Sequence, residues 1–200
     1  MKILSLNGSP RADGASASIM GRLIGKFSAN GHAVTRYDLN TLEISGCQEC
    51  FACRARKTDQ CAVRDGLTGP LEELKSADAV VIATPVFYGD VSAQLKCFID
   101  RTWSNFCGEN FSADHLPRGR KLVFIMSYGY ADETIYDSLW ERYRNYFGMF
   151  GFDECYLVKA RGAVHNSPAV VNADENEIQV AEITASFGDA QAGHILKERK

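Results

Sequence analysis

Residues 78–84, with the sequence Asp-Ala-Val-Val-Ile-Ala-Thr, contain a continuous apolar run with no alternation of polar side chains. A strand with one face in water alternates apolar and polar residues, whereas a strand covered on both faces is apolar throughout. A second run of this type, Leu-Val-Phe-Ile-Met, lies within residues 121–127. The two runs therefore predict strands of a parallel sheet that is covered by helices on both faces.

The segments on either side of these runs alternate between strand-like and helix-like patterns. Apolar residues recur at helical spacing in Ala15–Ala29, and Gly31 follows that segment as a helix-ending residue. The predicted order is strand Lys2–Asn7, helix Ala15–Ala29, strand Ala33–Leu39, helix Leu67–Ser76, strand Asp78–Thr84, helix Val91–Asn105, strand Lys121–Ser127, helix Asp132–Phe150, strand Glu154–Ala160 and helix Asp174–Glu198.

Five strands that alternate with helices imply right-handed crossovers within one parallel sheet. The pattern predicts an α/β protein with a flavodoxin-like, doubly wound, five-stranded parallel sheet in the order 2-1-3-4-5. The length of 200 residues predicts one domain over residues 1–200, with a cysteine-rich loop, residues 43–65, inserted after the second strand. Ligands of such sheets bind beyond the carboxyl ends of the strands.

The composition excludes several classes of protein. Lys and Arg number 22 and Asp and Glu 25, so the net charge is −3 and a nucleic-acid partner is not expected. No apolar run approaches the roughly 20 residues that cross a bilayer. The apolar part of the N-terminus is too short for a signal peptide. We therefore expect a cytoplasmic protein that does not associate with a membrane.

The first predicted strand leads into the loop Asn-Gly-Ser-Pro-Arg-Ala-Asp-Gly-Ala-Ser-Ala-Ser at residues 7–18, and a helix follows. Glycines permit close backbone approach, and a helix N-terminus presents free N–H groups to an anion. Serine hydroxyls and the Arg11 guanidinium add donors. The loop thus predicts a site for a phosphate monoester, and the alternative is an ordinary helix N-cap formed by Ser16 or Asp13.

Four of the seven cysteines lie within one short segment of the predicted loop. Their pattern is Cys47-x2-Cys50-x2-Cys53-x7-Cys61. In a reducing compartment such a group indicates metal binding or redox chemistry. The first spacings are those of the bacterial ferredoxin motif, so all four thiolates could hold one [4Fe–4S] cluster. Zinc, a redox disulfide pair or a motif without a metal remain as alternatives.

Two further stretches give the chain a family resemblance. The motif Asn-Gly-Ser-Pro-Arg at 7–11 resembles the start of the NADPH-dependent FMN reductase family. Residues 83–96, with the sequence Ala-Thr-Pro-Val-Phe-Tyr-Gly-Asp-Val-Ser-Ala-Gln-Leu-Lys, and Phe-Ile-Asp-Arg at 98–101 resemble its flavin-ring loop and the helix that follows. With the cysteine motif, the resemblance points to the iron–sulfur flavoprotein branch and covers about residues 1–130.

The resemblance implies three groups of cofactor ligands. The FMN phosphate would be held by Ser9, Arg11, Ser16, Ala17 and Ser18. The isoalloxazine ring would be held by Thr84, Pro85, Val86, Phe87, Tyr88 and Gly89, with Ser127, Tyr128 and Gly129 on its other side. The cluster would be held by Cys47, Cys50, Cys53 and Cys61. Members of the family often have Gly-Asn-Thr-Ser where this chain has Gly-Ala-Ser-Ala at 14–17.

The function implied by the resemblance is that of an FMN-dependent oxidoreductase or electron-transfer protein. It would pass electrons between a reduced donor, ferredoxin or NAD(P)H, and a small-molecule acceptor through FMN and a [4Fe–4S] cluster. The alternative is an NAD(P)H-dependent FMN or quinone reductase with FMN only, and a third hypothesis is a flavodoxin-like binding module without activity. No catalytic side chain is predicted, and a homodimer or homotetramer is expected.

Overall fold

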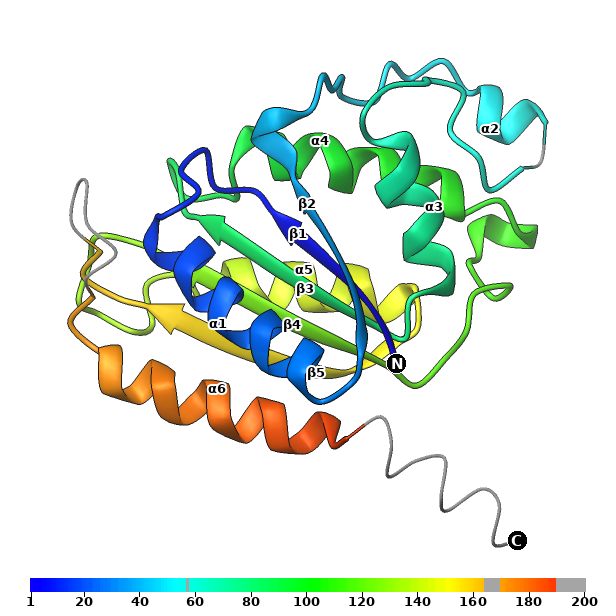
Figure 1. Cartoon of the computed structure of the whole chain (residues 1–200). Coiled ribbons are helices and arrows are strands. Elements are labelled where there is room, and N and C mark those ends of the chain that lie inside the picture. The colour runs from blue at the N-terminus through cyan, green and yellow to red at the C-terminus, as the bar shows by residue number, and fades with distance from the viewer. Residues whose placement is uncertain (57, 164–169, 190–200) are drawn as a thin grey trace, which may run out of the picture.

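The computed structural model describes residues 1–56, 58–163 and 170–189. Its centre is a five-stranded parallel sheet in the order β2-β1-β3-β4-β5, which confirms the predicted topology (Figure 1). The strands are β1 (Lys2–Asn7), β2 (Ala33–Asp38), β3 (Ala79–Pro85), β4 (Arg120–Ser127) and β5 (Phe152–Ala160). Every residue of β3 from Ala79 to Thr84 is buried, as the apolar run predicts.

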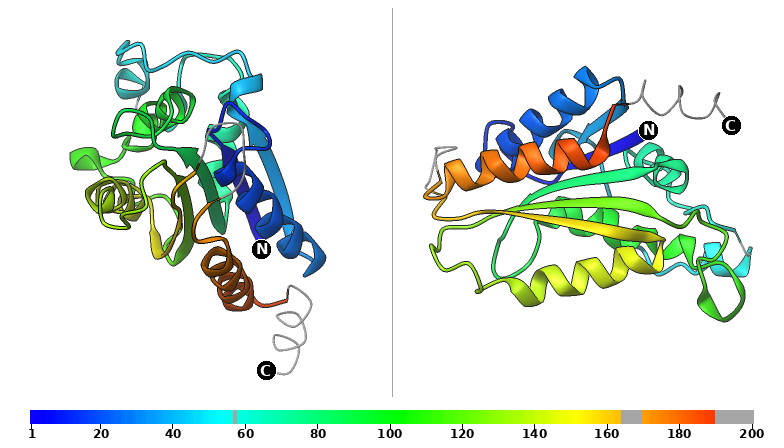
Figure 2. Two further views of the ribbon diagram at one scale, coloured as in Figure 1. Left: turned by 90° about the vertical axis from the view of Figure 1, so that its left-hand side faces the viewer. Right: turned by 90° about the horizontal axis from the view of Figure 1, so that it is seen from below.

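Helices cover both faces of the sheet. Figure 2 shows α1 (Ala15–Ala29) and α6 (Ala173–Phe187) on one face, with α3 (Thr68–Ser76), α4 (Ala93–Arg101) and α5 (Asp137–Met149) on the other. Each layer has its own core, because residues of β3 and β4 point alternately into one cluster of buried side chains and then the other. Within the described part of the chain, no helix is long and apolar enough to cross a membrane.

Some element boundaries differ from those predicted. Helix α5 begins at Asp137 rather than at residue 132, because the Asp132 carboxylate accepts hydrogen bonds from the Thr134 N–H and hydroxyl in a preceding turn. Helix α6 ends at Phe187, and Gly188 follows with a φ of +63°. The rest of the predicted helix, residues 190–198, lies outside the described residues. Short helices also occur at η1 (Leu39–Thr41), α2 (Ala52–Ala55), η2 (Thr102–Asn105) and η3 (Glu109–Phe111).

The loop after β1 packs tightly against the start of α4. The Gly8 N–H donates to the Ala83 carbonyl at 2.8 Å. A Cβ at Gly8 would lie 2.8 Å from both the Leu95 Cβ and the Ser92 Oγ. Ser92 caps α4 by accepting a hydrogen bond from the Leu95 N–H. This position therefore requires glycine because the two elements approach so closely.

We expect Gly8→Ala to destabilise the fold by about 1–3 kcal/mol, the usual cost of overpacking a core. Gly25→Ala is the matched control, because a Cβ there would meet nothing within 4 Å. Since alanine is the better helix former, the control should gain about 0.5–1 kcal/mol. Urea unfolding monitored by tryptophan fluorescence measures both changes. Equal stability of the two variants would contradict the close approach at Gly8.

Candidate functional site

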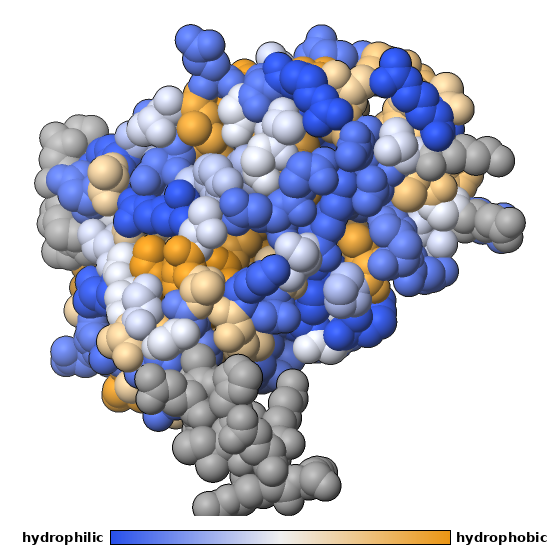
Figure 3. Space-filling model, turned by 45° about the vertical axis from the view of Figure 1, so that its right-hand side comes forward, coloured by the Kyte–Doolittle hydropathy of each residue, from blue (hydrophilic) through white to orange (hydrophobic). Residues whose placement is uncertain are grey.

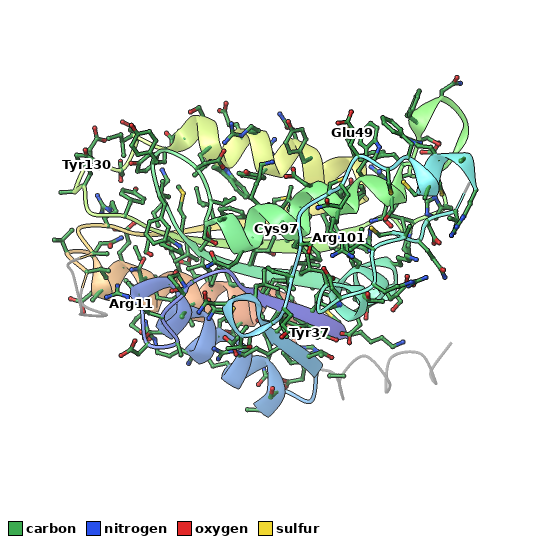
Figure 4. All side chains as sticks on the ribbon, turned by 90° about the horizontal axis from the view of Figure 1, so that it is seen from above. Arg11, Tyr37, Glu49, Cys97, Arg101 and Tyr130 are labelled. Carbon is green, nitrogen blue, oxygen red and sulfur yellow. The ribbon has the colours of Figure 1, made fainter. Side chains whose placement is uncertain are left out.

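Three loops meet at the carboxyl edge of the sheet. They follow β1, β3 and β4, the three central strands. The Val86 N–H donates to the Ser127 carbonyl at 2.8 Å, so the second and third loops are joined directly. Figure 4 shows Arg11 of the first loop and Tyr130 of the third at this end of the molecule. The predicted cofactor residues are thus brought to one edge, whereas the cysteines lie elsewhere.

The loop after β1 is held by its own polar groups. The Asn7 side chain accepts the Ser9 N–H at 3.0 Å and donates to the Asp38 carboxylate at 2.8 Å. The Ser9 hydroxyl donates to the Arg11 carbonyl at 2.9 Å and accepts the Arg11 N–H at 3.2 Å. Ser9 is therefore already engaged within the loop, and its contact with a ligand would be shared with the backbone.

The start of α1 has the features of an anion site. Gly14 occupies the N-cap position and no side chain caps the helix there, so the alternative of a cap by Ser16 or Asp13 is wrong. The first helical donor is the Ser18 N–H, which reaches the Gly14 carbonyl at 2.8 Å, and the preceding N–H groups point out of the helix. Ser16 is only 1% exposed, and its hydroxyl has no partner in the described structure. A buried hydroxyl without a partner at such a terminus fits a phosphate oxygen.

The loop after β3 is a two-residue hairpin with exposed aromatic rings. Phe87 and Asp90 exchange backbone hydrogen bonds at 2.8 and 3.1 Å. Tyr88 and Gly89 between them have φ angles of +54° and +84°, as in a type I′ turn. The left-handed conformation is uncommon for tyrosine, and such positions cluster at ligand sites. The Phe87 and Tyr88 rings are both exposed, so either can offer a π-face to a flat ring.

Asp90 anchors this hairpin to α5. Its carboxylate accepts the Val91 N–H at 2.7 Å and the Tyr143 hydroxyl at 2.6 Å, and it pairs with the Arg142 guanidinium at 2.9 Å. Tyr143 is buried, and burial together with the hydrogen bond to Asp90 raises its pKa well above the ordinary value. On the other side of the hairpin, the buried Thr84 hydroxyl accepts the Ser92 N–H at 3.1 Å.

Tyr143→Phe should destabilise the protein by about 1–2 kcal/mol, because it removes a hydrogen bond to a charged group while Val91 and Arg142 still hold Asp90. The folded-state pKa of Tyr143 is raised, so this contribution is fully present below about pH 10 and is lost as the pH rises further. Urea unfolding at pH 8 measures the loss. Tyr146→Phe, at an exposed tyrosine of the same helix, should change little. Equal losses in the two variants would argue against the Asp90 anchor.

The loop after β4 buries one tyrosine ring and exposes another. Tyr128 is buried against Tyr136, with ring centroids 5.0 Å apart. Burial raises the Tyr128 pKa to about 12, and its hydroxyl has no partner among the residues that the structure describes. Tyr130, two residues on, is exposed instead. Ser127 lies beside the hairpin, since its carbonyl accepts the Val86 N–H, and Gly129 is exposed.

The cysteine-rich loop lies at the opposite end of α4 from the hairpin (Figures 1 and 4). The nine residues of α4 span about 13 Å at 1.5 Å per residue. Cys47, Cys50, Cys53 and Cys61 all line one cavity of about 340 Å³, together with the end of α4. In the described ranges, no three metal-ligating side chains are gathered closely enough to hold an ion. The four thiols therefore line one cavity, but in the described structure they are spaced too widely to bind a single metal ion together.

The backbone of the loop adds features that the sequence did not predict. Glu49 and Phe51, which flank Cys50, have φ angles of +50° and +52°. Left-handed residues next to right-handed ones give a concave arrangement of backbone N–H groups, called a nest. Nests favour anions, including iron–sulfur clusters. The short helix α2 follows, and its Arg54 guanidinium packs over both the Trp103 and Phe111 rings, 4.6 and 4.2 Å from their centroids. Figure 3 shows hydrophobic side chains among hydrophilic ones over this upper part of the molecule.

Comparisons with known proteins agree with this architecture. An iron-sulfur flavoprotein of Methanocaldococcus jannaschii is 29% identical over 102 residues, 51% of this chain and 52% of the relative. One from Methanosarcina thermophila is 31% identical over 102 residues, with the same coverage. The chain spans about half the length of these curated relatives. An NAD(P)H:quinone oxidoreductase structure from Methanothermobacter marburgensis has a TM-score of 0.70 at 19% identity, covering 93% of this chain and 94% of the other.

A structure of an FMN-dependent NADH-azoreductase from Bacillus anthracis, in complex with FMN, has a TM-score of 0.67 at 17% identity. It covers 94% of this chain and 99% of the other. At these identities the structural likeness establishes the fold. The model of the NADPH-dependent FMN reductase family matches residues 1–136, which include the loops after β1, β3 and β4. The chain therefore belongs to the NADPH-dependent FMN reductase family.

Proposed function

We propose that this chain is an FMN-dependent oxidoreductase whose FMN lies at the carboxyl edge of the sheet. The observation that carries the proposal is the Ser16 hydroxyl, which is buried without a partner at the uncapped start of α1. Burying an unpaired hydroxyl costs free energy, and a phosphate oxygen at this position would remove that cost. The dipole of α1 would stabilise the same negative charge.

The chain's own residues would bind and orient the cofactor. The loop 7–18 would hold the phosphate through Ser16, Ser18, Arg11 and the N–H groups of the first helical turn, including that of Ala17. The hairpin would hold the ring through residues 84–89, and residues 127–129 would lie on the other side. FMN bound there would supply transfer of a hydride or of single electrons, so no side chain need act as an acid or base.

We further propose that the four cysteines hold a [4Fe–4S] cluster, and that electrons pass between ferredoxin or NAD(P)H and a small-molecule acceptor. Support comes from the common cavity, from the left-handed residues beside Cys50, and from the names of the curated relatives. All seven cysteines are free thiols, which suits a reducing, cytoplasmic location.

The test is an absorption spectrum of protein purified without oxygen, with flavin, iron and sulfide assays on the same sample. We expect one FMN with about four irons and four sulfides per chain. FMN without iron would exclude the cluster and leave an NAD(P)H-dependent FMN or quinone reductase. Failure to bind added FMN would overturn the whole proposal in favour of a binding module without flavin.

One observation favours the reductase without a cluster as the second candidate. Cys47 and Cys50 are exposed, and no three cysteines of the described loop lie close enough together to hold a metal ion. A matching relative is an FMN-dependent NADH:quinone oxidoreductase of Rhizobium meliloti, 27% identical over 134 residues, 64% of this chain and 61% of the relative. Iron content distinguishes the two candidates directly.

We also propose that the chain forms a homodimer or homotetramer. A groove of about 450 Å³ between α4 and α5 is lined by aromatic side chains, and several large apolar residues around it are exposed. These are Trp103, Phe111, Tyr146 and Met149. Burying such a surface against a second copy would stabilise the pair. Light scattering that shows a monomer at working concentration would overturn this proposal.

A further inference from the structure

Arg101 is a buried charge at the end of α4 that the FMN site does not use. It is 1% exposed, and its guanidinium reaches both ends of the cysteine-rich loop. Nη1 donates to the Asp65 carboxylate at 2.5 Å and to the Ser45 carbonyl at 3.3 Å. Nη2 donates to the Val63 carbonyl at 2.6 Å. The side chain therefore joins the segments before and after the cysteines.

Asp65, at the end of the cysteine-rich loop, also binds the segment that precedes the cysteines. Its carboxylate also accepts the Ser45 N–H at 2.8 Å and the Leu67 N–H at 2.9 Å. Arg101 and Asp65 are thus linked to each other, and both are bonded to the backbone of Ser45. Ser45 and Asp65 are 20 residues apart in the chain, so their contact closes the cysteine-rich segment, whose regular structure is the short helix α2.

Arg101 also forms part of the wall around the cysteines. It lines the same cavity as all four of them. Its Nε has no partner among the residues described. Figure 4 shows Arg101 beneath the loop, with Cys97 of the same helix beside it. A cationic group with an unused donor therefore lies beside the thiols.

We propose that Arg101 is a positioning residue that closes the cysteine-rich loop and raises the reduction potential of the cluster held there, while Asp65 opposes that rise. The inference rests on the proposed cluster. Reduction adds one negative charge to a cluster, so a neighbouring cation stabilises the reduced form and a neighbouring anion destabilises it. Hydrogen bonds and net charge around the sulfurs are general determinants of cluster potentials.

Potentiometric titration of the reconstituted protein, followed by electron paramagnetic resonance, tests the electrostatic part. Arg101→Gln should shift the oxidation equilibrium about tenfold toward the oxidised cluster, which is 59 mV for one electron. Asp65→Asn should shift it in the opposite direction, because it leaves the Arg101 charge uncompensated. Arg101→Lys keeps the charge and should remain near the wild-type potential. A purely structural role would not give shifts of opposite sign in Arg101→Gln and Asp65→Asn.

Arg64→Gln is the matched control. Arg64 belongs to the same loop, is exposed, and donates to the Gln60 side chain at 3.2 Å. It should leave the potential unchanged. FMN content reports that each variant is folded, because the flavin edge lies at the other end of α4. If Arg101→Gln does not fold, the sign of the Asp65→Asn shift still decides the proposal.

Trypsin digestion of the metal-free protein tests the positioning part without any cluster. Arg54 lies within the loop with its guanidinium packed over two aromatic rings, and cleavage after it requires the loop to open. Arg101→Gln and Asp65→Asn should be cleaved there at least about tenfold faster than wild type and Arg64→Gln. Equal cleavage rates would overturn the positioning role. Wild-type protein that takes up no iron would instead overturn the proposed cluster and the tuning of its potential, and digestion would still decide the positioning.

Discussion

Replacing Ser16 with aspartate is expected to lower the affinity for FMN by at least about 100-fold, because it puts a carboxylate where the phosphate would bind. The serine is buried at the start of α1, so the new charge could not turn away into water. The aspartate would itself occupy the anion site through the free N–H groups of the first turn. Ser16→Ala loses only the hydroxyl, and a hydrogen bond to a charged group is worth about 1.5–3 kcal/mol. That variant should bind about 10- to 100-fold more weakly.

Quenching of flavin fluorescence during titration of metal-free protein measures these affinities. Riboflavin, which lacks the phosphate, is the informative second ligand, because its binding should change much less than that of FMN in Ser16→Ala. Ser28→Asp is the matched control on the same helix, since Ser28 lies at the exposed far end and its hydroxyl donates to the Ile24 carbonyl. Equal losses for riboflavin and FMN in Ser16→Ala would contradict a phosphate contact at this residue.

The sheet could be predicted from sequence because its signals are local. The apolar run at 78–84 becomes β3, and the alternation of strands and helices leaves few topologies open. The loops after β1 and β3 could be placed for the same reason, since they follow strands whose carboxyl ends share one edge. The last helix was predicted to continue to residue 198, but it ends at Phe187 because Gly188 leaves the helical conformation.

The remaining features depend on contacts between distant residues. In the structure Asp100 pairs with Lys96, and Arg101 pairs with Asp65. No local pattern marks a partner 36 residues away, and the contacts of Arg54 depend on aromatic residues that lie even farther along the chain. Similarly, the sequence could not show that Tyr128 points inward while Tyr130 is exposed, because both flank the same glycine.

Cys53→Ser is expected to remove most of the iron, from about four atoms per chain to fewer than about one, while FMN stays at one per chain. A serine hydroxyl is not ionised at neutral pH and is a poor ligand for iron, so three thiolates would remain. Cys53 is half-buried directly before the anchored Arg54, so a neighbouring group is poorly placed to replace its sulfur. Iron and flavin assays on protein purified without oxygen give both numbers from one sample.

Cys155→Ser is the control for this experiment. Cys155 lies in β5 outside the loop, is half-buried like Cys53, and its thiol donates to the Phe152 carbonyl at 3.3 Å. It should keep its full iron content. Full iron in Cys53→Ser would exclude that residue as a ligand. The retention of FMN is the sharper part of the expectation. The cysteine cavity lies at one end of α4 and the hairpin proposed to hold the flavin ring lies at the other, so removing a thiol should leave the hairpin intact. Joint loss of iron and flavin would mean that the loop supports the flavin edge, in one chain or between two.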